Sequence, residues 1–78
     1  MSLASLTQGE GRPLVLLHGW GMNAGVWTSL LPRLRTQWRV TMIELPGHGE
    51  SDFVDGDIHE WARAVLEAAP PTATWLGW

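Results

Sequence analysis

Three short apolar runs along the chain predict buried β-strands. The first, Leu14–Leu17, contains no polar residue and stops at a His-Gly pair, which is typical of a strand buried on both faces. The second spans Arg39–Leu45 and ends in a tight Pro-Gly turn, and the third spans Ala73–Gly77. A weaker strand candidate covers Leu3–Thr7, before a turn that contains glycine and proline. Strands buried on both faces belong to parallel sheets.

Residues with helical spacing separate these strands. A first helix is expected from Asn23, an N-cap residue type, with Pro32 inside the apolar pattern, where it should kink or shorten the helix. A second helix follows Asp57, and Asp57 and Glu60 together resemble a capping box. This helix is expected to stop before Pro70. The apolar positions of the second helix are Ile58, Trp61, Ala62, Val65, Leu66 and Ala69.

The alternation of strand, helix, strand, helix, strand predicts an α/β fold. The connections are long enough to join parallel strands, and the right-handed crossover rule then gives a parallel-sheet, three-layer sandwich. The third strand has nothing after it that could cover its face. We therefore expect residues 1–78 to be the N-terminal part of a single, larger α/β domain.

Composition indicates one small domain and argues against several kinds of partner. The 78 residues are 45% hydrophobic and 17% charged, too apolar for a disordered chain and too short for two domains. The absence of cysteine excludes disulfides and thiolate zinc sites. A net charge of -3 without a basic stripe argues against nucleic acid. No apolar run approaches the roughly 20 residues of a membrane span, so we expect a cytoplasmic protein with no membrane contact.

Candidate chemistry lies where the predicted strands end, because ligands in open α/β sheets bind at the carboxyl ends of the strands. The three segments at these ends are rich in glycine: 18–22, 44–51 and 77–78. The first segment allows a dinucleotide site, since Gly19, Gly21 and Ala24 fit the pattern G-x-G-x-x-A. Glu44 then stands where a ribose-binding acid would be. The bulky Trp20 crowds such a loop, and this pattern alone is a weak signal.

Taken together, the three segments resemble the α/β-hydrolase family in the same order and at similar spacing. The residues that carry this resemblance are His18-Gly19-Trp20-Gly21, Glu44-Leu45-Pro46-Gly47-His48-Gly49-Glu50-Ser51 and Gly77-Trp78. A narrower likeness links the chain to the BioH carboxylesterases, which act on the methyl ester of pimeloyl-acyl-carrier protein in biotin synthesis. The residues that carry the narrower likeness are Leu16–Ala24, Val26-Trp27 and Trp75–Trp78.

The resemblance implies a serine-nucleophile carboxylesterase whose catalytic site is incomplete in this chain. Gly77 and Trp78 would open the G-x-S-x-G nucleophile elbow, so the α/β-hydrolase fold is cut before its nucleophile. In this family one N–H of the oxyanion hole comes from the loop after the first of these strands, which assigns that role to the backbone of Trp20. Gly19 and Gly21 would let this backbone turn inward. The indoles of Trp20 and Trp78 would line the acyl pocket.

Partners and supporting residues also follow from the resemblance. It implies an acyl ester substrate, with acyl-carrier protein as a candidate partner, and no metal or organic cofactor. His18 is interpreted as a loop-positioning residue and not as a base, because the catalytic His of this family comes last in chain order. The other loop-positioning residues are Gly19, Gly21 and Gly77. Glu44 stands where Asp is usual and Glu50 where Arg is common. A generic short-chain carboxylesterase stays open as an alternative.

The remaining histidines and tryptophans favour structural roles. His48 is expected to be a turn residue, and His59 is expected on the polar face of the second helix. Ser51 with Asp52 forms a capping or turn pair more often than a catalytic couple. The tryptophans expected in or near the core are Trp27, Trp38, Trp61 and Trp75.

Overall fold

The computed structural model describes residues 3–78 as one sheet with helical segments on both of its faces. The elements in chain order are β1 (Ser5–Gln8), β2 (Arg12–Leu17), the 3₁₀ helix η1 (Ala24–Trp27), α1 (Leu31–Leu34), β3 (Trp38–Ile43), α2 (Ile58–Ala68) and β4 (Thr74–Gly77). The three strands predicted from apolar runs are β2, β3 and β4. No helix within residues 3–78 is long and apolar enough to cross a membrane.

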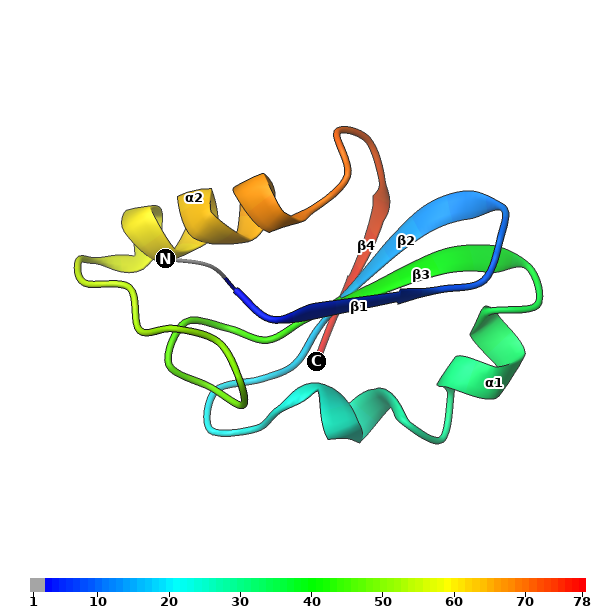
Figure 1. Ribbon diagram of the computed structural model, residues 1–78, viewed down its shortest axis with the longest axis horizontal. Coiled ribbons are helices and arrows are strands. Elements are labelled where there is room, and N and C mark those ends of the chain that lie inside the picture. Colours follow the sequence, from blue (N-terminus) through cyan, green and yellow to red (C-terminus); the bar gives the residue numbers. More distant parts are fainter. Residues whose placement is uncertain (1–2) are drawn as a thin grey trace.

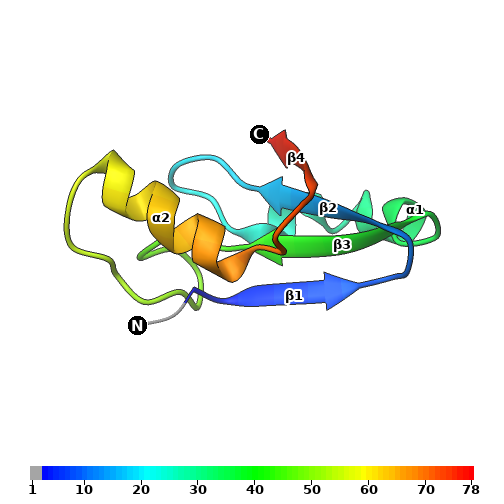
Figure 2. The ribbon, with the colours of Figure 1, turned by 90° about the horizontal axis from the view of Figure 1, so that it is seen from above.

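The strands lie side by side in the order β1, β3, β2, β4 (Figure 2). Strands β2, β3 and β4 are parallel, and Leu16 at the centre of the sheet pairs with Met42 on one side and Leu76 on the other. The parallel α/β arrangement is therefore confirmed. The prediction of a purely parallel sheet was wrong for β1, which pairs with β3 in the antiparallel direction. The sheet is therefore mixed.

A glycine turn explains how β1 reaches its unexpected partner. β1 and β2 flank β3, so the short connection between them crosses the start of β3. Gly9 has a φ of +89°, and a Cβ atom on it would collide with the carbonyl oxygen of Trp38. Gly11 is as tightly enclosed, because its Cβ atom would collide with the carbonyl oxygen of Gln37. Only glycine fits at these two positions. β1 spans Ser5–Gln8 and not Leu3–Thr7, so it ends one residue later than predicted, directly before the turn at Gly9.

Alternating side chains of the strands form two separate apolar clusters, one on each face of the sheet. The face toward η1 and α1 buries these residues: Leu14, Leu16, Trp27, Val40 and Met42. The opposite face, toward α2, buries Val15, Ile43 and Val65. Figure 1 shows α1 and α2 on opposite sides of the sheet. The three-layer sandwich is thus confirmed, with a thin core in each half.

The first predicted helix is broken into two short pieces. Asn23 caps η1 as expected, and its side-chain oxygen accepts the N–H of Gly25 at 2.8 Å. The four-residue helix α1 then starts separately, with Pro32 in its first turn. Proline lacks the N–H that a continuous helix needs and collides with the carbonyl four residues earlier, but the first turn tolerates it. The proline therefore divides the segment more completely than the predicted kink.

Helix α2 begins and ends where its sequence signals indicate, to within one residue. Asp57 accepts the N–H groups of His59 at 3.0 Å and Glu60 at 3.3 Å, so the predicted N-cap is confirmed. The helix stops at Ala68, because Ala69 is already extended ahead of Pro70. Its N-terminal end and the loop before it lie at one end of the molecule (Figure 1).

The isolated chain is expected to be marginally stable and prone to aggregation. β4 is an edge strand whose residues are all exposed, and its apolar side chains Trp75 and Leu76 are 41% and 42% exposed on opposite faces. Unpaired edges with exposed apolar side chains promote association. Size-exclusion chromatography and thermal unfolding of residues 1–78 test this. A monomer with a sharp, cooperative unfolding transition would contradict the expectation.

Candidate active site

The ends of β2 and β4 meet beside the first glycine-rich loop. The N–H of Trp78 donates to the carbonyl oxygen of Leu17 at 3.0 Å, which continues the pairing of the two strands. A Cβ atom on Gly19 would lie only 3.0 Å from Cδ1 of Trp78. A side chain at this position would therefore press on the indole. The structure thus brings together the two segments that the resemblance to α/β-hydrolases singled out.

Trp20 presents an unused N–H group on a tight turn. The N–H of Met22 donates to the carbonyl oxygen of Gly19 at 3.1 Å, which closes a turn over 19–22. Gly21 has a φ of +81°, a conformation that favours glycine. Within residues 3–78 the Trp20 N–H has no hydrogen-bond acceptor. A free peptide N–H on a constrained turn is the kind of donor that an oxyanion hole requires.

His18 joins two loops through both of its ring nitrogens. The side chain is 3% exposed, and its Nε2 accepts the N–H of Leu45 at 3.0 Å. Nδ1 lies 2.8 Å from the carbonyl oxygen of Gly19 and therefore carries the proton that it donates. No lone pair is left for a general base, which supports the loop-positioning interpretation. Because the Leu45 N–H is taken by His18, β3 ends at Ile43 and not at Leu45 as predicted.

The carboxylate of Glu44 accepts backbone N–H groups from two loops. Oε1 accepts from Glu50 at 3.0 Å and Oε2 accepts from Ala24 at 3.1 Å. The hydrogen bond from Glu50 is the main cause that lowers the pKa of Glu44; burial opposes it, and the hydrogen bond from Ala24 acts in the same direction as that from Glu50. Glu44 is thus an ionised link between the loops after β2 and β3.

The contacts of Glu44 argue against the dinucleotide alternative. Its carboxylate is already engaged by backbone N–H groups and is not free for a ribose. It also occupies the N–H of Ala24, at the helix start that a pyrophosphate would need. That helix is a four-residue 3₁₀ segment and not a full α-helix. The pattern formed by Gly19, Gly21 and Ala24 is therefore a chance match.

The ionised state of Glu44 gives the folded protein a pH-dependent stability. A carboxyl whose pKa is lower in the folded state stabilises it above the unfolded pKa, here about 4.5, and this contribution is lost as the pH falls through the folded pKa. Glu44→Gln keeps the size and removes the charge. We expect the variant to unfold at lower urea concentration than wild type at pH 7, and the difference to shrink below about pH 4.5. A difference that stays constant from pH 7 to pH 3 would rule out this role.

Ser51 is fully engaged in the loop and is not a nucleophile. Its hydroxyl donates to the carbonyl oxygen of Glu44 at 2.5 Å and accepts the N–H of Ala4 at 2.8 Å. The expected structural role of Ser51 is consistent with these bonds. The same hydroxyl ties the residues before β1 to the loop after β3, so it closes this end of the sheet.

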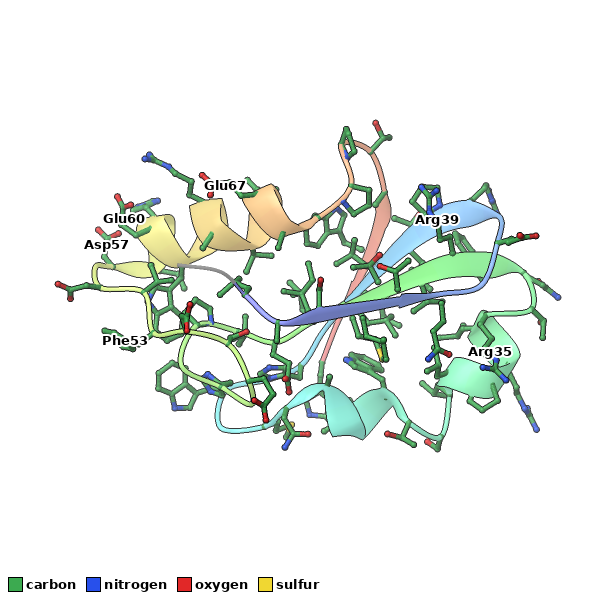
Figure 3. The ribbon with its side chains drawn as sticks, in the orientation of Figure 1. Arg35, Arg39, Phe53, Asp57, Glu60 and Glu67 are labelled. Atoms are coloured by element: carbon green, nitrogen blue, oxygen red, sulfur yellow. The ribbon has the colours of Figure 1, made fainter. Side chains whose placement is uncertain are left out.

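The indoles of Trp20 and Trp78 pack against different aromatic rings. The indole of Trp20 is 76% exposed and stacks on Trp61 of α2, with ring centroids 5.4 Å apart and planes inclined by 20°. The indole of Trp78 instead meets Trp27 edge-on at 6.4 Å. Phe53, on the loop before α2 (Figure 3), meets Trp61 edge-on at 6.4 Å. The two indoles predicted to line one acyl pocket therefore pack against different faces of the sheet.

An apolar groove of about 540 Å³ lies between α2 and the sheet. Its lining residues are Leu17, Trp20, Leu45, Ile58, Trp61, Ala62, Val65, Leu66 and Trp75. Trp61 is half-buried, as expected for a core or partly buried tryptophan, whereas Trp75 is 41% exposed and the same expectation was wrong for it. The stacking of Trp61 on Trp20 had no signal in the sequence beyond the aromatic type of both residues. Within residues 3–78 no cluster of His, Cys, Asp or Glu could hold a metal ion.

Two curated relatives match almost the whole of this chain. The pimeloyl-[acyl-carrier protein] methyl ester esterase of Photobacterium profundum is 49% identical over 73 residues, which cover 92% of this chain and 29% of that protein. The esterase of the same name from Methylococcus capsulatus is 48% identical over 79 residues, covering 100% of this chain and 31% of that protein. The chain thus spans about 30% of the length of these curated relatives.

Solved structures agree with the sequence relatives. A marine microorganism esterase superposes with a TM-score of 0.78 at 29% identity and covers 85% of this chain and 26% of its own. An alpha/beta hydrolase from Sphaerobacter thermophilus superposes with a TM-score of 0.80 at 25% identity, covering 96% of this chain and 31% of its own. Residues 12–77 match the sequence profile of the alpha/beta hydrolase fold. The resemblance carried by the three glycine-rich segments is confirmed, and the chain belongs to the alpha/beta hydrolase fold family.

Proposed function

We propose that the whole protein containing this chain is a serine carboxylesterase that hydrolyses the methyl ester of pimeloyl-acyl-carrier protein. The observation that carries this proposal is the near-50% identity, over almost the entire chain, to two esterases that bear this name. The free N–H of Trp20 beside the end of β4 supports it, because acyl transfer needs such a donor next to the nucleophile.

Residues of this chain supply part of the catalytic site in the proposed enzyme. The Trp20 N–H donates to the oxyanion, and a second donor comes from the residue that follows the nucleophile. Gly77 and Trp78 begin the nucleophile elbow, with the serine expected directly after Trp78. Support for this assignment comes from the contact of Trp78 with Gly19, which puts the end of β4 against the oxyanion-binding turn.

The proposed reaction is a two-step acyl transfer. The serine hydroxyl attacks the ester carbonyl while a histidine elsewhere in the protein accepts its proton, and the resulting oxyanion is held partly by the Trp20 N–H. Collapse of this intermediate releases methanol and leaves an acyl-enzyme, which water then hydrolyses to the free acid and the serine. The chemistry calls for no metal or organic cofactor.

Acyl-carrier protein is the proposed macromolecular partner, and the cytoplasm the proposed compartment. The pimeloyl chain would lie against the exposed indoles of Trp20 and Trp78, which are 76% and 74% exposed. Trp20 lines the apolar groove between α2 and the sheet, whereas the indole of Trp78 lies next to Gly19 and meets Trp27.

A direct comparison of two esters tests the proposed substrate. We expect the whole protein to release methanol from methyl-pimeloyl-acyl-carrier protein with a higher kcat/KM than that for a p-nitrophenyl ester of a short acid. Hydrolysis of the p-nitrophenyl ester alone would identify a generic short-chain carboxylesterase instead. Hydrolysis of neither ester would refute the proposed function.

Residues 1–78 by themselves are expected to have no esterase activity. The chain offers an oxyanion donor, but Ser51 and His18 are both committed to backbone contacts. The measurement is the rate of p-nitrophenyl acetate hydrolysis by a preparation free of host esterases, with a heat-treated sample as the control. A rate above that control would show that a nucleophile within this chain has been overlooked.

A further inference from the structure

His48 links the loop after β3 to the turn that carries Trp20. It is half-buried, and its Nε2 lies 2.9 Å from the backbone nitrogen of Gly21. A peptide N–H can only donate, so Nε2 is the acceptor in this bond. The two residues are 27 positions apart in sequence, and the bond acts on the residue next to Trp20. The proposed reaction gives this imidazole no chemical step.

The second ring nitrogen fixes the tautomer of His48. Nδ1 lies 3.0 Å from the carbonyl oxygen of Pro46, and a carbonyl oxygen can only accept. Nδ1 therefore carries the proton, and Nε2 keeps the lone pair that binds the Gly21 N–H. Both bonds are satisfied together only by the neutral Nδ1–H form.

The bond from Gly21 controls the orientation of a peptide group within the turn. Trp20 and Gly21 are the two central residues of the turn over 19–22, and the φ of +81° at Gly21 is typical of the third position of a type II turn. Type I and type II turns differ mainly in the orientation of the peptide between these central residues. By accepting the Gly21 N–H, His48 holds that peptide in one of the two orientations.

His18 makes the complementary connection between the same two loops. His18 lies in the loop after β2 and accepts the N–H of Leu45 in the loop after β3. His48 lies in the loop after β3 and accepts the N–H of Gly21 in the loop after β2. The centroids of the two imidazoles are 5.2 Å apart. His18 fixes the start of the turn through the carbonyl of Gly19, and His48 fixes its far side through the N–H of Gly21. Trp20 lies between the two fixed points.

We propose that His48 is a positioning residue that pre-organises the oxyanion donor of Trp20. The Trp20 N–H belongs to the preceding peptide, whose Gly19 carbonyl is bonded by His18 and Met22, and the His48 bond holds the peptide that follows. The Trp20 backbone is therefore fixed on both sides before the substrate binds. Donors that need no reorganisation during the reaction stabilise the transition state most effectively. This inference rests on the proposed esterase function, because only there does the Trp20 N–H have a catalytic role.

Two conservative variants of the whole protein separate the hydrogen bond from the ring. His48→Gln keeps an acceptor at the place of Nε2, whereas His48→Asn keeps a polar group only at the place of Nδ1. We expect His48→Asn to lower kcat on a short p-nitrophenyl ester about tenfold, less than the loss of a whole oxyanion donor, with KM and Tm close to wild type. His48→Gln should restore most of kcat. The affinity for a boronic acid that forms a tetrahedral adduct should fall in His48→Asn and recover in His48→Gln, in parallel with kcat.

Two outcomes would overturn the role of His48 while the wild-type protein remains an active esterase. The first is an equal loss of kcat in His48→Asn and His48→Gln. The second is a change in KM with kcat unchanged in His48→Asn. A wild-type protein that cleaves no ester refutes the proposed function instead. The long-range ¹H–¹⁵N spectrum of the wild-type histidines shows which ring nitrogen of His48 carries the proton. It tests the role of His48 without an activity measurement, and it replaces the variants if His48→Asn does not fold. We expect a protonated Nδ1 and an unprotonated Nε2; a protonated Nε2 would overturn the proposal.

Discussion

Trp20→Pro in the whole protein is expected to lower kcat by about 10² to 10³, the usual effect of losing one oxyanion donor. Proline has no N–H, so the substitution deletes the proposed donor and nothing else of the backbone chemistry. Trp20 occupies the second position of the turn over 19–22, where proline is favoured, and the turn should therefore survive. Circular dichroism and the unfolding midpoint establish that the variant is folded before kcat is compared.

Trp20→Ala is the matched control, because it removes the indole and keeps the N–H. It removes the stacking on Trp61 and the edge contact with His48. We expect a higher KM and a changed acyl-chain preference, with most of kcat retained on the smallest ester, since only uniform binding is lost. A folded Trp20→Ala protein without activity on that ester would show that the indole takes part in the chemistry.

Leu16→Ala is expected to destabilise the whole protein by about 2 to 5 kcal/mol, as Leu-to-Ala changes in cores do. Leu16 is 0% exposed at the centre of the sheet, where it pairs with both β3 and β4. The surrounding side chains relax only partially after such a truncation, so part of the vacated volume remains as a cavity. Urea unfolding of both proteins measures the difference in the free energy of unfolding.

Leu6→Ala provides the comparison at an exposed site of the same sheet. Leu6 lies on the edge strand β1 and is 50% exposed, so the same change in chemistry should cost well under half of the Leu16 value. Similar losses in the two variants would contradict the burial of the β2 strand that leads into the His18 loop.

The parallel part of the fold was predictable because each element carries its own signal. The run Leu14–Leu17 has no polar side chain to turn toward water, so it predicted a strand buried on both faces. Asp57, directly before a helical pattern, predicted the start of α2. The antiparallel pairing of β1 had no such local signal. It depends on Gly9 and Gly11 crossing the start of β3, and the close approach of that backbone is a tertiary feature.

The site was predictable only where residue type determines the chemistry. The glycines at 19 and 21 predicted a tight turn after a buried strand, whereas the roles of the Trp20 N–H and of His18 came only from the resemblance to α/β-hydrolases. The contact between His48 and Gly21 spans 27 residues and depends on how two loops approach each other, so no spacing rule reveals it. Sequence patterns likewise gave no indication that the indole of Trp20 would stack on α2.

A crystal structure of the whole protein after reaction with a pimelate-like methyl p-nitrophenyl phosphonate tests whether the Trp20 N–H holds the oxyanion. The serine oxygen bonds to phosphorus as p-nitrophenolate leaves and the catalytic histidine takes the serine proton, and a phosphonyl oxygen then stays where the oxyanion forms. We expect an adduct on a serine directly after Trp78, with that oxygen about 2.7 to 3.1 Å from the backbone nitrogen of Trp20. An adduct on another residue, or a phosphonyl oxygen bound elsewhere while the Trp20 N–H points away, would contradict it.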